Sequence, residues 1–361
     1  MTDISILVEE TLQIEPYQQS EGERSKRLST VLNKMFQHHL SCREYKRIID
    51  VLHGGVSKFD SIENAPFIPV RLFKKIKLTS IPDSQVVKTM TSSGTTGQEL
   101  SKIYLDRATA QAQTRALTQI MRSIIGNTRV PMLVIDSRAT VNDRLQFSAR
   151  GAAIRGFSLY GKDVTYALDD DMQIDYEKVE NFFDKYKEKN VLIFGFTFVI
   201  WEFFLKALEK TGKFIPFHNA TVLHGGGWKK LASLNISQNT FALELKKSLG
   251  TVKVTNYYGM IEQTGSIFIE CSNGYMHTSA YSDVIIRNPI DFSEVPDGNE
   301  GLIQLLSIIP MSYPGHSILS EDVGVIVNRD FCSCGRRGKH FLVRGRIKDA
   351  ELRGCSDATI L

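Results

Sequence analysis

Short apolar segments alternate with longer amphipathic segments between residues 106 and 255, and this alternation constrains the fold more than any other feature of the chain. It predicts strands at 130–135, 191–194, 221–223 and 252–255, and helices at 106–123, 176–187, 199–210 and 240–249. Strands and helices that alternate in this way form a sheet that helices cover on both faces. We therefore expect an α/β fold.

The regions on either side of this alternation have a different character. Helical segments are expected at 24–36 and 42–52, and after residue 275 short strands are expected at 284–287, 301–307, 324–327 and 341–343. We therefore divide the chain into a helical N-terminal region at 1–85, an α/β core at 86–274, a smaller β-rich subdomain at 275–345 and a hinge-like tail at 346–361.

Composition excludes some classes of function. The 44 Lys and Arg residues exceed the 40 Asp and Glu residues by a net charge of only +4, which does not indicate a nucleic-acid partner. The most apolar segment, 191–205, contains Glu202 and is shorter than the roughly 20 residues that a membrane span needs. The N-terminus has no signal-peptide pattern, and the five cysteines, an odd number, favour a reducing, cytoplasmic compartment.

A loop of hydroxyl residues and glycines follows the short segment 86–90. Glycine lets the backbone approach phosphate oxygens closely, and hydroxyl groups add uncharged donors. The spacing is not that of a Walker A loop, and a flexible surface loop is the alternative. The loop indicates nucleotide binding by the core at 86–274, and its residues are Thr91, Ser92, Ser93, Gly94, Thr95, Thr96 and Gly97.

Two further segments follow expected strands. Gly225, Gly226 and Gly227 leave backbone exposed, which suits a flat ring lying against the main chain, although a tight turn between packed backbones is the alternative. The second segment, 256–262, contains aromatic side chains and ends at Glu262, which could equally be a solvated turn carboxylate.

In this order the segments resemble those of the adenylate-forming enzymes, the superfamily of acyl-CoA synthetases, firefly luciferase and peptide-synthetase adenylation domains. The family's phosphate loop ends in Pro-Lys; here Glu99 and Leu100 occupy those positions and Lys102 follows. The resemblance implies ATP as substrate and Lys102 as a candidate catalytic residue.

The remaining motifs carry further roles over from the family. Its Tyr-Gly-x-Thr-Glu motif matches Tyr257, Tyr258, Gly259 and Glu262, with Ile261 in place of threonine. The resemblance implies that an aromatic ring stacks on adenine, that Glu262 holds Mg²⁺ against the phosphates and that Gly225–Gly227 lines the adenine site. It also places Asp322 and Arg346 around the ribose hydroxyls.

Over nearly its whole length the chain resembles the acyl-protein synthetases of the bacterial luminescence fatty-acid reductase complex, and more distantly phenylacetate-CoA ligases. Shared motifs include Phe36-Gln37-His38-His39, Ile68-Pro69-Val70-x-x-Phe73-Lys74 and Gly354-Cys355. The resemblance implies the large N-terminal domain of the adenylate-forming fold without the C-terminal lid domain. It also implies a fatty acid as substrate, Cys355 as the thiol that accepts the acyl group, and a reductase as partner.

The sequence does not decide which thiol accepts the acyl group or which residues line the acyl pocket. A thiolate at Cys355 is a strong nucleophile, but CoA or a carrier protein could supply an external thiol instead. The motif departures Leu100 and Ile261 also leave room for a catalytically inactive binding subunit. Gly195, Phe196 and Phe198 are candidate walls of an acyl pocket, or plain core.

Three cysteines and one histidine form a candidate metal set in loops of the β-rich region. Cys271, His277, Cys332 and Cys334 supply the Cys₃His combination typical of closed zinc sites. The alternative is two unrelated reduced pairs. Four protein ligands leave no open position, so we expect a structural rather than a catalytic Zn²⁺.

Overall fold

The computed structural model describes residues 3–92, 99–142, 149–226, 231, 234 and 236–347. They form two compact units. Unit 1 combines the described residues up to Thr91 with Glu99–Ile120 and with those from Gly259 onward, and unit 2 is built around Met121–Tyr258. The helical N-terminal region and the β-rich subdomain thus fold together in unit 1, and the four-part division expected from the sequence stays a proposal.

Unit 2 is built on a parallel sheet, ordered β8-β7-β6-β4-β5. In chain order its strands are β4 (Val130–Ser137), β5 (Gly161–Leu168), β6 (Asn190–Phe196), β7 (Phe217–Gly225) and β8 (Gly250–Tyr258). Every residue of β4 is buried, and so is every residue of β6 after Asn190. Such continuous burial is expected for central strands with both faces covered.

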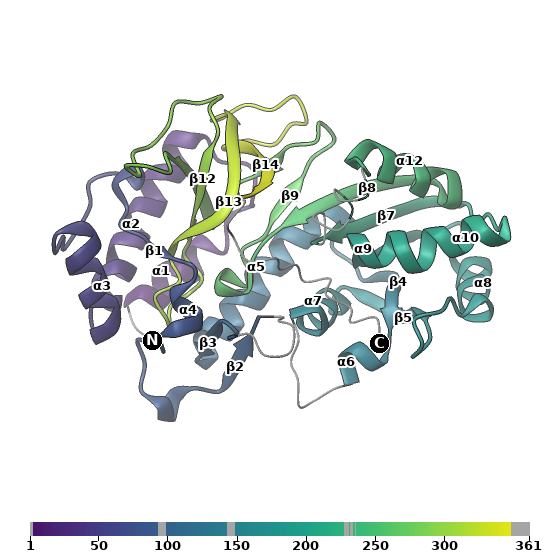
Figure 1. The fold of residues 1–361 in the computed structure, drawn as a ribbon, viewed down its shortest axis with the longest axis horizontal. Helices are drawn as coiled ribbons and strands as arrows, with labels where there is room; N and C mark the ends of the chain where they lie inside the picture. Colours follow the sequence, from purple (N-terminus) through teal and green to yellow (C-terminus); the bar gives the residue numbers. More distant parts are fainter. Residues whose placement is uncertain are drawn as a thin grey trace. The chain divides into compact units, whose positions relative to one another are not determined.

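Helices connect these strands on both faces of the sheet. They are α6 (Ala139–Asn142), α7 (Ala149–Ser158), α8 (Tyr176–Tyr186), α9 (Thr197–Val199), α10 (Lys206–Thr211) and α12 (Gln238–Leu249). After β5 the chain returns to the other side of β4, so right-handed crossovers place α7 on one face and α8, α10 and α12 on the other (Figure 1). Between α9 and α10, Ile200–Leu205 form a π-helix where the sequence predicts plain α-helix.

Unit 1 joins helices from the beginning of the chain to a mainly antiparallel sheet. The helices are α1 (Asp3–Thr11), α2 (Glu21–His39), α3 (Arg43–His53), α4 (Leu72–Lys75) and the first part of α5 (Arg107–Ile125). The sheet is ordered β11-β12-β13-β14-β10-β9, and a separate hairpin pairs β2 with β3. The strands of this sheet and of the hairpin are β2 (Lys88–Thr91), β3 (Lys102–Leu105), β9 (Phe268–Glu270), β10 (Met276–His277), β11 (Ser282–Arg287), β12 (Gly301–Ser307), β13 (Ser317–Asn328) and β14 (His340–Arg346).

The long strand β13 has two successive partners along one edge. Its first residues pair in parallel with the two-residue strand β1 (Ile68–Pro69), and the stretch from Asp322 onward pairs with β14 in antiparallel fashion. Glu321 and Asp322 therefore lie where the chain that leaves β1 and the last residue of β14 meet on β13. This junction positions the candidate site of unit 1.

A buried group of charges anchors α2 to the sheet of unit 1. Arg24 lies 3.1 Å from Asp283 and donates to the Ser282 carbonyl oxygen over 2.9 Å. Lys339 lies 3.2 Å from the second oxygen of Asp283, and Glu21 contacts Arg24. Because an unpaired buried charge is costly, each member depends on the others.

The predicted α/β fold is confirmed. The expected strands lie within β4, β6, β7, β8, β11, β12, β13 and β14, and the expected helices match α2, α3, α5, α8 and α12. The edge strand β5 is absent from the sequence-based expectation because its residues are only partly buried and form no continuous apolar run. No helix in the described ranges has the length and apolarity that a membrane crossing requires.

Candidate active site and candidate metal centre

Glu262 lies in a short 3₁₀ turn of unit 1, Ile261–Gln263, and only 5% of it is exposed. Two hydrogen bonds join this turn to the segment that follows β12. Tyr313 donates to the Glu262 carbonyl oxygen over 2.9 Å, and the Gln263 amide donates to the Gly315 carbonyl oxygen over 2.9 Å. A Cβ at Gly315 would come within 2.7 Å of that same Glu262 oxygen, so close packing here requires glycine.

Three polar residues surround the Glu262 carboxylate. Burial raises the pKa of Glu262, and the Ser101 side chain and the charges of Lys74 and Arg346 oppose that rise. Sequence reasoning missed Ser101 as a site residue, although it lies only four residues after Gly97 of the phosphate loop. It quoted Lys74 only as part of a shared motif and gave it no role.

Asp322 and Arg346, the expected ribose ligands, are paired across β13 and β14. Arg346 Nε lies 3.1 Å from Asp322 Oδ1, and both side chains are partly exposed. Since Arg346 also acts on Glu262, the structure brings three of the expected site residues, Asp322, Arg346 and Glu262, into one polar region of unit 1.

The β2–β3 hairpin presents the phosphate loop. Thr91 pairs with Lys102 at the end of the hairpin from which the loop continues, and Lys102 is exposed. Ser92 is described and partly buried. Ser93, Gly94, Thr95, Thr96 and Gly97 lie outside the described residues, as do Gly227 and Cys355.

The glycine and tyrosine segments of unit 2 meet at the carboxyl ends of parallel strands. Gly225 is in register with Tyr257, and a Cβ on Gly225 would lie 2.6 Å from the Tyr257 ring. Gly226 has a φ of +68°, a conformation that favours glycine. The Tyr257 ring lies 5.1 Å from the Phe157 ring and stacks on Phe194 at 6.3 Å.

Side chains of successive strand residues point to opposite faces of a sheet, so Tyr257 and Tyr258 face different sides. Tyr257 is engaged in the aromatic cluster with Phe157 and Phe194. Tyr258, which directly precedes Gly259 as the tyrosine of the family motif does, stays a candidate to stack on adenine. Gly259, the next residue, belongs to unit 1, where a Cβ on it would come within 3.1 Å of Ile267.

The candidate acyl-pocket residues lie at the end of β6. Phe196 is buried with only 1% exposed, Phe198 is 8% exposed, and a Cβ on Gly195 would lie 2.8 Å from Ile200. Beside them His224 accepts from or donates to the Thr197 hydroxyl at 2.9 Å, and burial lowers the pKa of His224 to about 3. The described residues here form a packed, neutral interior.

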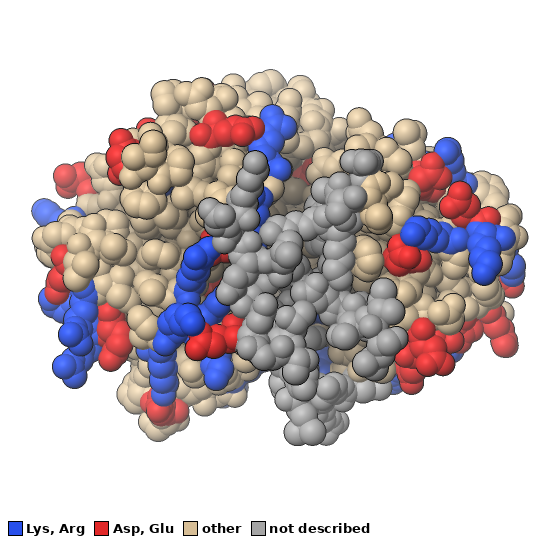
Figure 2. Space-filling model, viewed as in Figure 1, with Lys and Arg blue, Asp and Glu red and all other residues tan. Residues whose placement is uncertain are grey.

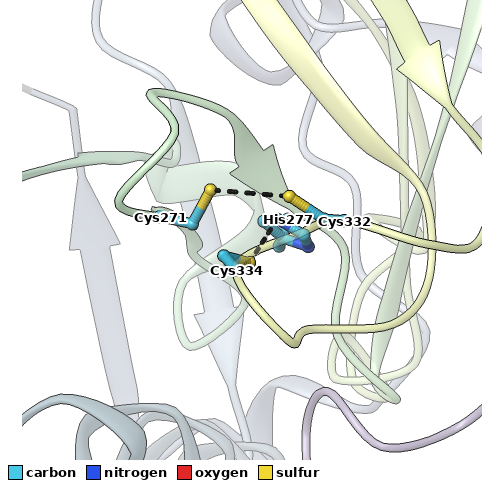
Figure 3. A group of neighbouring side chains, drawn as sticks. All are labelled: Cys271, His277, Cys332 and Cys334. Carbon is cyan, nitrogen blue, oxygen red and sulfur yellow. Dashed lines mark hydrogen bonds between the residues drawn. The ribbon is translucent and has the colours of Figure 1, made fainter.

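The four candidate metal ligands converge in unit 1 (Figure 3). Cys271 follows β9, Cys332 and Cys334 lie between β13 and β14, and all four ligand atoms lie within 4.8 Å of one another. His277 belongs to β10 rather than to a loop, so the sequence-based placement of that ligand in a loop is wrong. The strand pairings of β10 with β9 and β14 bring the two halves of the set together.

The geometry fits a tetrahedral zinc ion. Zn–S bonds of about 2.3 Å and Zn–N bonds of about 2.0 Å imply ligand atoms about 3.5 to 3.8 Å apart. The Cys271 and Cys332 sulfurs are 4.0 Å apart, and Cys334 Sγ is 3.5 Å from His277 Nε2. The Asn273 side-chain amide donates to Cys332 Sγ over 3.3 Å, which favours a thiolate.

The charge states of these groups also suit a cation. Burial lowers the pKa of His277 to about 3, so its ring is neutral and keeps a lone pair. Burial raises the pKa of Cys334 to about 11, with the neighbouring sulfurs contributing. A divalent cation would offset this crowding of sulfurs.

Comparison with known proteins places the chain in a family. The family model described as acyl-protein synthetase, LuxE, matches residues 2–360. Two relatives are each named long-chain-fatty-acid–luciferin-component ligase. The relative from Aliivibrio fischeri is 22% identical over 86% of this chain and 82% of its own length, and that from Vibrio harveyi is 21% identical over 94% and 89%.

Solved structures agree on the fold. An open conformation of 2-hydroxyisobutyryl-CoA ligase, in complex with 2-HIB-AMP and CoA, matches with a TM-score of 0.71 at 16% identity, covering 93% of this chain and 78% of that one. The postadenylation state of the same ligase matches with a TM-score of 0.66. Since the family model spans residues 2–360, this chain belongs to the LuxE family of acyl-protein synthetases, and it is an acid–thiol ligase that activates a carboxylic acid with ATP and transfers the acyl group to protein.

Proposed function

We propose that the chain activates a long-chain fatty acid as its acyl-AMP and transfers the acyl group to its own Cys355. The observation that carries this proposal is the family match over residues 2–360, combined with the polar region around Glu262 in unit 1. The names of the two relatives support a fatty acid as the substrate.

In the first step the acid's carboxylate oxygen attacks the α-phosphorus of ATP. A P–O bond forms, the bond between the α- and β-phosphates breaks, and pyrophosphate leaves with the electron pair. Thr91, Ser92 and the loop that follows them would bind phosphate oxygens, and Asp322 and Arg346 would exchange part of their mutual contact for the ribose hydroxyls. Tyr258, Gly225 and Gly226 would hold the adenine.

Glu262 is the residue we assign to Mg²⁺. When bound, Mg²⁺ would neutralise charge on the phosphate oxygens. Burial restricts the solvation of the Glu262 carboxylate, and the Ser101 side chain and the positive charge of Lys74 counter the resulting rise in its pKa. Lys102 is retained as a candidate contact to the phosphates.

In the second step the Cys355 thiolate attacks the acyl carbon, a thioester forms and AMP leaves. An acyl reductase would then receive the acyl group. CoA or a carrier-protein thiol is the alternative acceptor, and an inactive binding subunit is the alternative from a different class. A cytoplasmic location belongs to the proposal, because the thiol chemistry needs a reducing compartment.

We also propose that Cys271, His277, Cys332 and Cys334 bind a structural Zn²⁺. The support is the convergence of three sulfurs and one imidazole at near-tetrahedral spacing. All four ligands come from the protein, so the ion would link the β9–β10 hairpin to the β13–β14 connection and take no part in acyl transfer.

The acyl-transfer proposal is tested by intact-protein mass spectrometry after incubation with ATP, Mg²⁺ and fatty acids of different lengths. Wild type is compared with Cys355→Ser and with Ser356→Ala, a matched control at the next residue. We expect an ATP-dependent mass gain, equal to the mass of the fatty acid minus water, in wild type and Ser356→Ala but not in Cys355→Ser.

Two other outcomes would replace the proposal. Acid-dependent pyrophosphate release without an adduct would make an external thiol the acceptor. If neither an adduct nor pyrophosphate appears with any acid, the chain is better described as an inactive binding subunit.

A further inference from the structure

The segment Ile68–Lys77 contains a shared motif to which the mechanism above gives no task. It passes from strand β1 through α4 and carries Arg71, Lys74, Lys75 and Lys77. Figure 2 shows Lys and Arg side chains gathered over α4 and the chain beside it. Three of these cations have carboxylate partners: Arg71 pairs with Glu321, Lys75 with Glu99, and Lys77 with Asp83 at 2.6 Å. Lys74 is the one whose charge acts on Glu262.

The backbone of this segment is fixed to β13 next to the candidate site. Ile68 pairs with Ile318, and the Val70 N–H donates to the Leu319 carbonyl oxygen over 3.0 Å. The ion pair between Arg71 and Glu321 then fixes the start of α4 beside Asp322, the expected ribose ligand. The contacts of Ile68, Val70 and Arg71 thus hold the start of α4 against β13.

A second set of contacts joins α4 to the turn that carries Glu262. The Phe73 side chain is buried, and its ring meets the Tyr313 ring edge-on at 6.2 Å. Tyr313 in turn donates to the Glu262 carbonyl oxygen over 2.9 Å. Residue 74 therefore follows an anchored aromatic residue, and its half-buried side chain lies close enough to influence the Glu262 carboxylate.

We propose that Lys74 contacts the anionic reactants of adenylation at the Glu262 end of the site and stabilises the negative charge on the α-phosphate as pyrophosphate leaves. This inference rests on the proposed adenylation and adds one residue to it. Lys74 donates hydrogen bonds and exchanges no proton, so the bonds made and broken are those already given for the first step. A fixed ammonium in a partly buried site acts without reorganisation as charge develops.

A structural alternative is that Lys74 only balances the charge of Glu262. The two roles differ in what happens when that charge is removed. In a Glu262→Gln background, a lysine that only balanced Glu262 would have no remaining effect on ligand binding. A lysine that contacts the ligand would keep its effect, and a double-mutant cycle measures this difference.

The test uses the full chain and compares Lys74→Ala, Lys74→Arg and Lys74→Gln with Lys75→Ala, a control at the adjacent lysine whose partner is the exposed Glu99. Acid-dependent ATP–pyrophosphate exchange reports adenylation alone. We expect Lys74→Ala and Lys74→Gln to lower kcat by about 100- to 1,000-fold with a smaller change in the KM for ATP, the range seen when one donor to a developing oxyanion is lost. Lys74→Arg should recover part of the loss, and Lys75→Ala should stay within about twofold of wild type.

The double-mutant cycle combines Lys74→Ala with Glu262→Gln, and its readout is the binding of a non-hydrolysable acyl-sulfamoyl adenosine, measured by calorimetry. The inference requires Lys74→Ala to weaken binding in both backgrounds. It is overturned if exchange by Lys74→Ala and Lys74→Gln matches wild type, if Lys75→Ala loses as much, or if the binding effect disappears with Glu262→Gln. Absence of exchange in wild type would instead overturn the proposed function, and the binding cycle would still decide the role of Lys74.

Discussion

At the scale of single residues, the carboxyl end of β7 shows how strictly the backbone fixes side-chain identity. Gly225 sits in register with Tyr257, and the Tyr257 ring fills the space where a larger residue 225 would place its first carbon. The Tyr257 ring also packs against the rings of Phe157 and Phe194. The Tyr257 ring therefore cannot move away from residue 225 without disturbing its contacts with Phe157 and Phe194.

We therefore predict that Gly225→Ala destabilises the protein by about 1–3 kcal/mol, the usual cost of overpacking, and weakens ATP binding. Urea unfolding and calorimetry with ATP measure the two effects. Gly22→Ala is the matched control, because a Cβ at Gly22 meets no atom within 4 Å and alanine suits the helix α2. Equal stability of the two variants would contradict the close approach of Gly225 and Tyr257.

At the scale of elements, the β9–β10 hairpin and the β13–β14 connection illustrate how two separate pieces of chain share one site. Each brings two ligands, and the pairing of His277 with His340 aligns β10 with β14. Positive φ at Gly274 and Gly335 lets each ligand loop turn tightly after its cysteine.

For the metal centre we predict one zinc ion per chain after purification without chelators, found by elemental analysis. Cys334→Ser should lose the metal and lower the unfolding temperature, because binding energy in such a site is folding energy. Cys42→Ser, at a buried cysteine at the start of α3, should keep its zinc whatever its effect on stability. Zinc retained by Cys334→Ser would argue against the proposed ligand set.

Sequence patterns predicted these elements unevenly. Strands β4 and β6 could be predicted from the sequence because their apolar runs reflect burial on both faces. Strand β5 mixes exposed and buried residues at the edge of its sheet, so it has no such run. Cysteine and histidine name a metal set by their chemistry alone. Ser101 and Lys74 have side chains of no such specific chemistry. The closeness of Lys74 to Glu262 depends on the packing of α4 against Tyr313, some 240 residues later in the chain.

At the scale of the whole molecule, buried neutral histidines make stability depend on pH. Burial lowers the pKa of His316 and of His224 to about 3 from the ordinary 6.5, and it also lowers the pKa of His39. His39 and His316 stack at 4.9 Å in unit 1. Below pH 6.5 the unfolded chain binds protons that the folded chain excludes, so stability falls between pH 6.5 and about 3.

We predict that the urea midpoint falls as the pH is lowered from 7 to 5, with each such histidine contributing about 2 kcal/mol at pH 5. His316→Phe, which keeps a ring beside Phe36, should show a shallower dependence than wild type. His218→Gln should follow wild type, since the His218 side chain is 66% exposed. Identical slopes for His316→Phe and wild type would show that His316 is not held neutral.

The charge group around Arg24 also bears on the order in which the chain can be completed during synthesis. Its carbonyl partner on Ser282 lies 258 residues farther along, and Lys339 is added later still. A nascent chain that has emerged only as far as the parallel strands of unit 2 can form the Arg24–Glu21 pair but has neither Asp283 nor Lys339. Helix α2 can therefore gain this anchor to the sheet only after β11 and Lys339 have been synthesised.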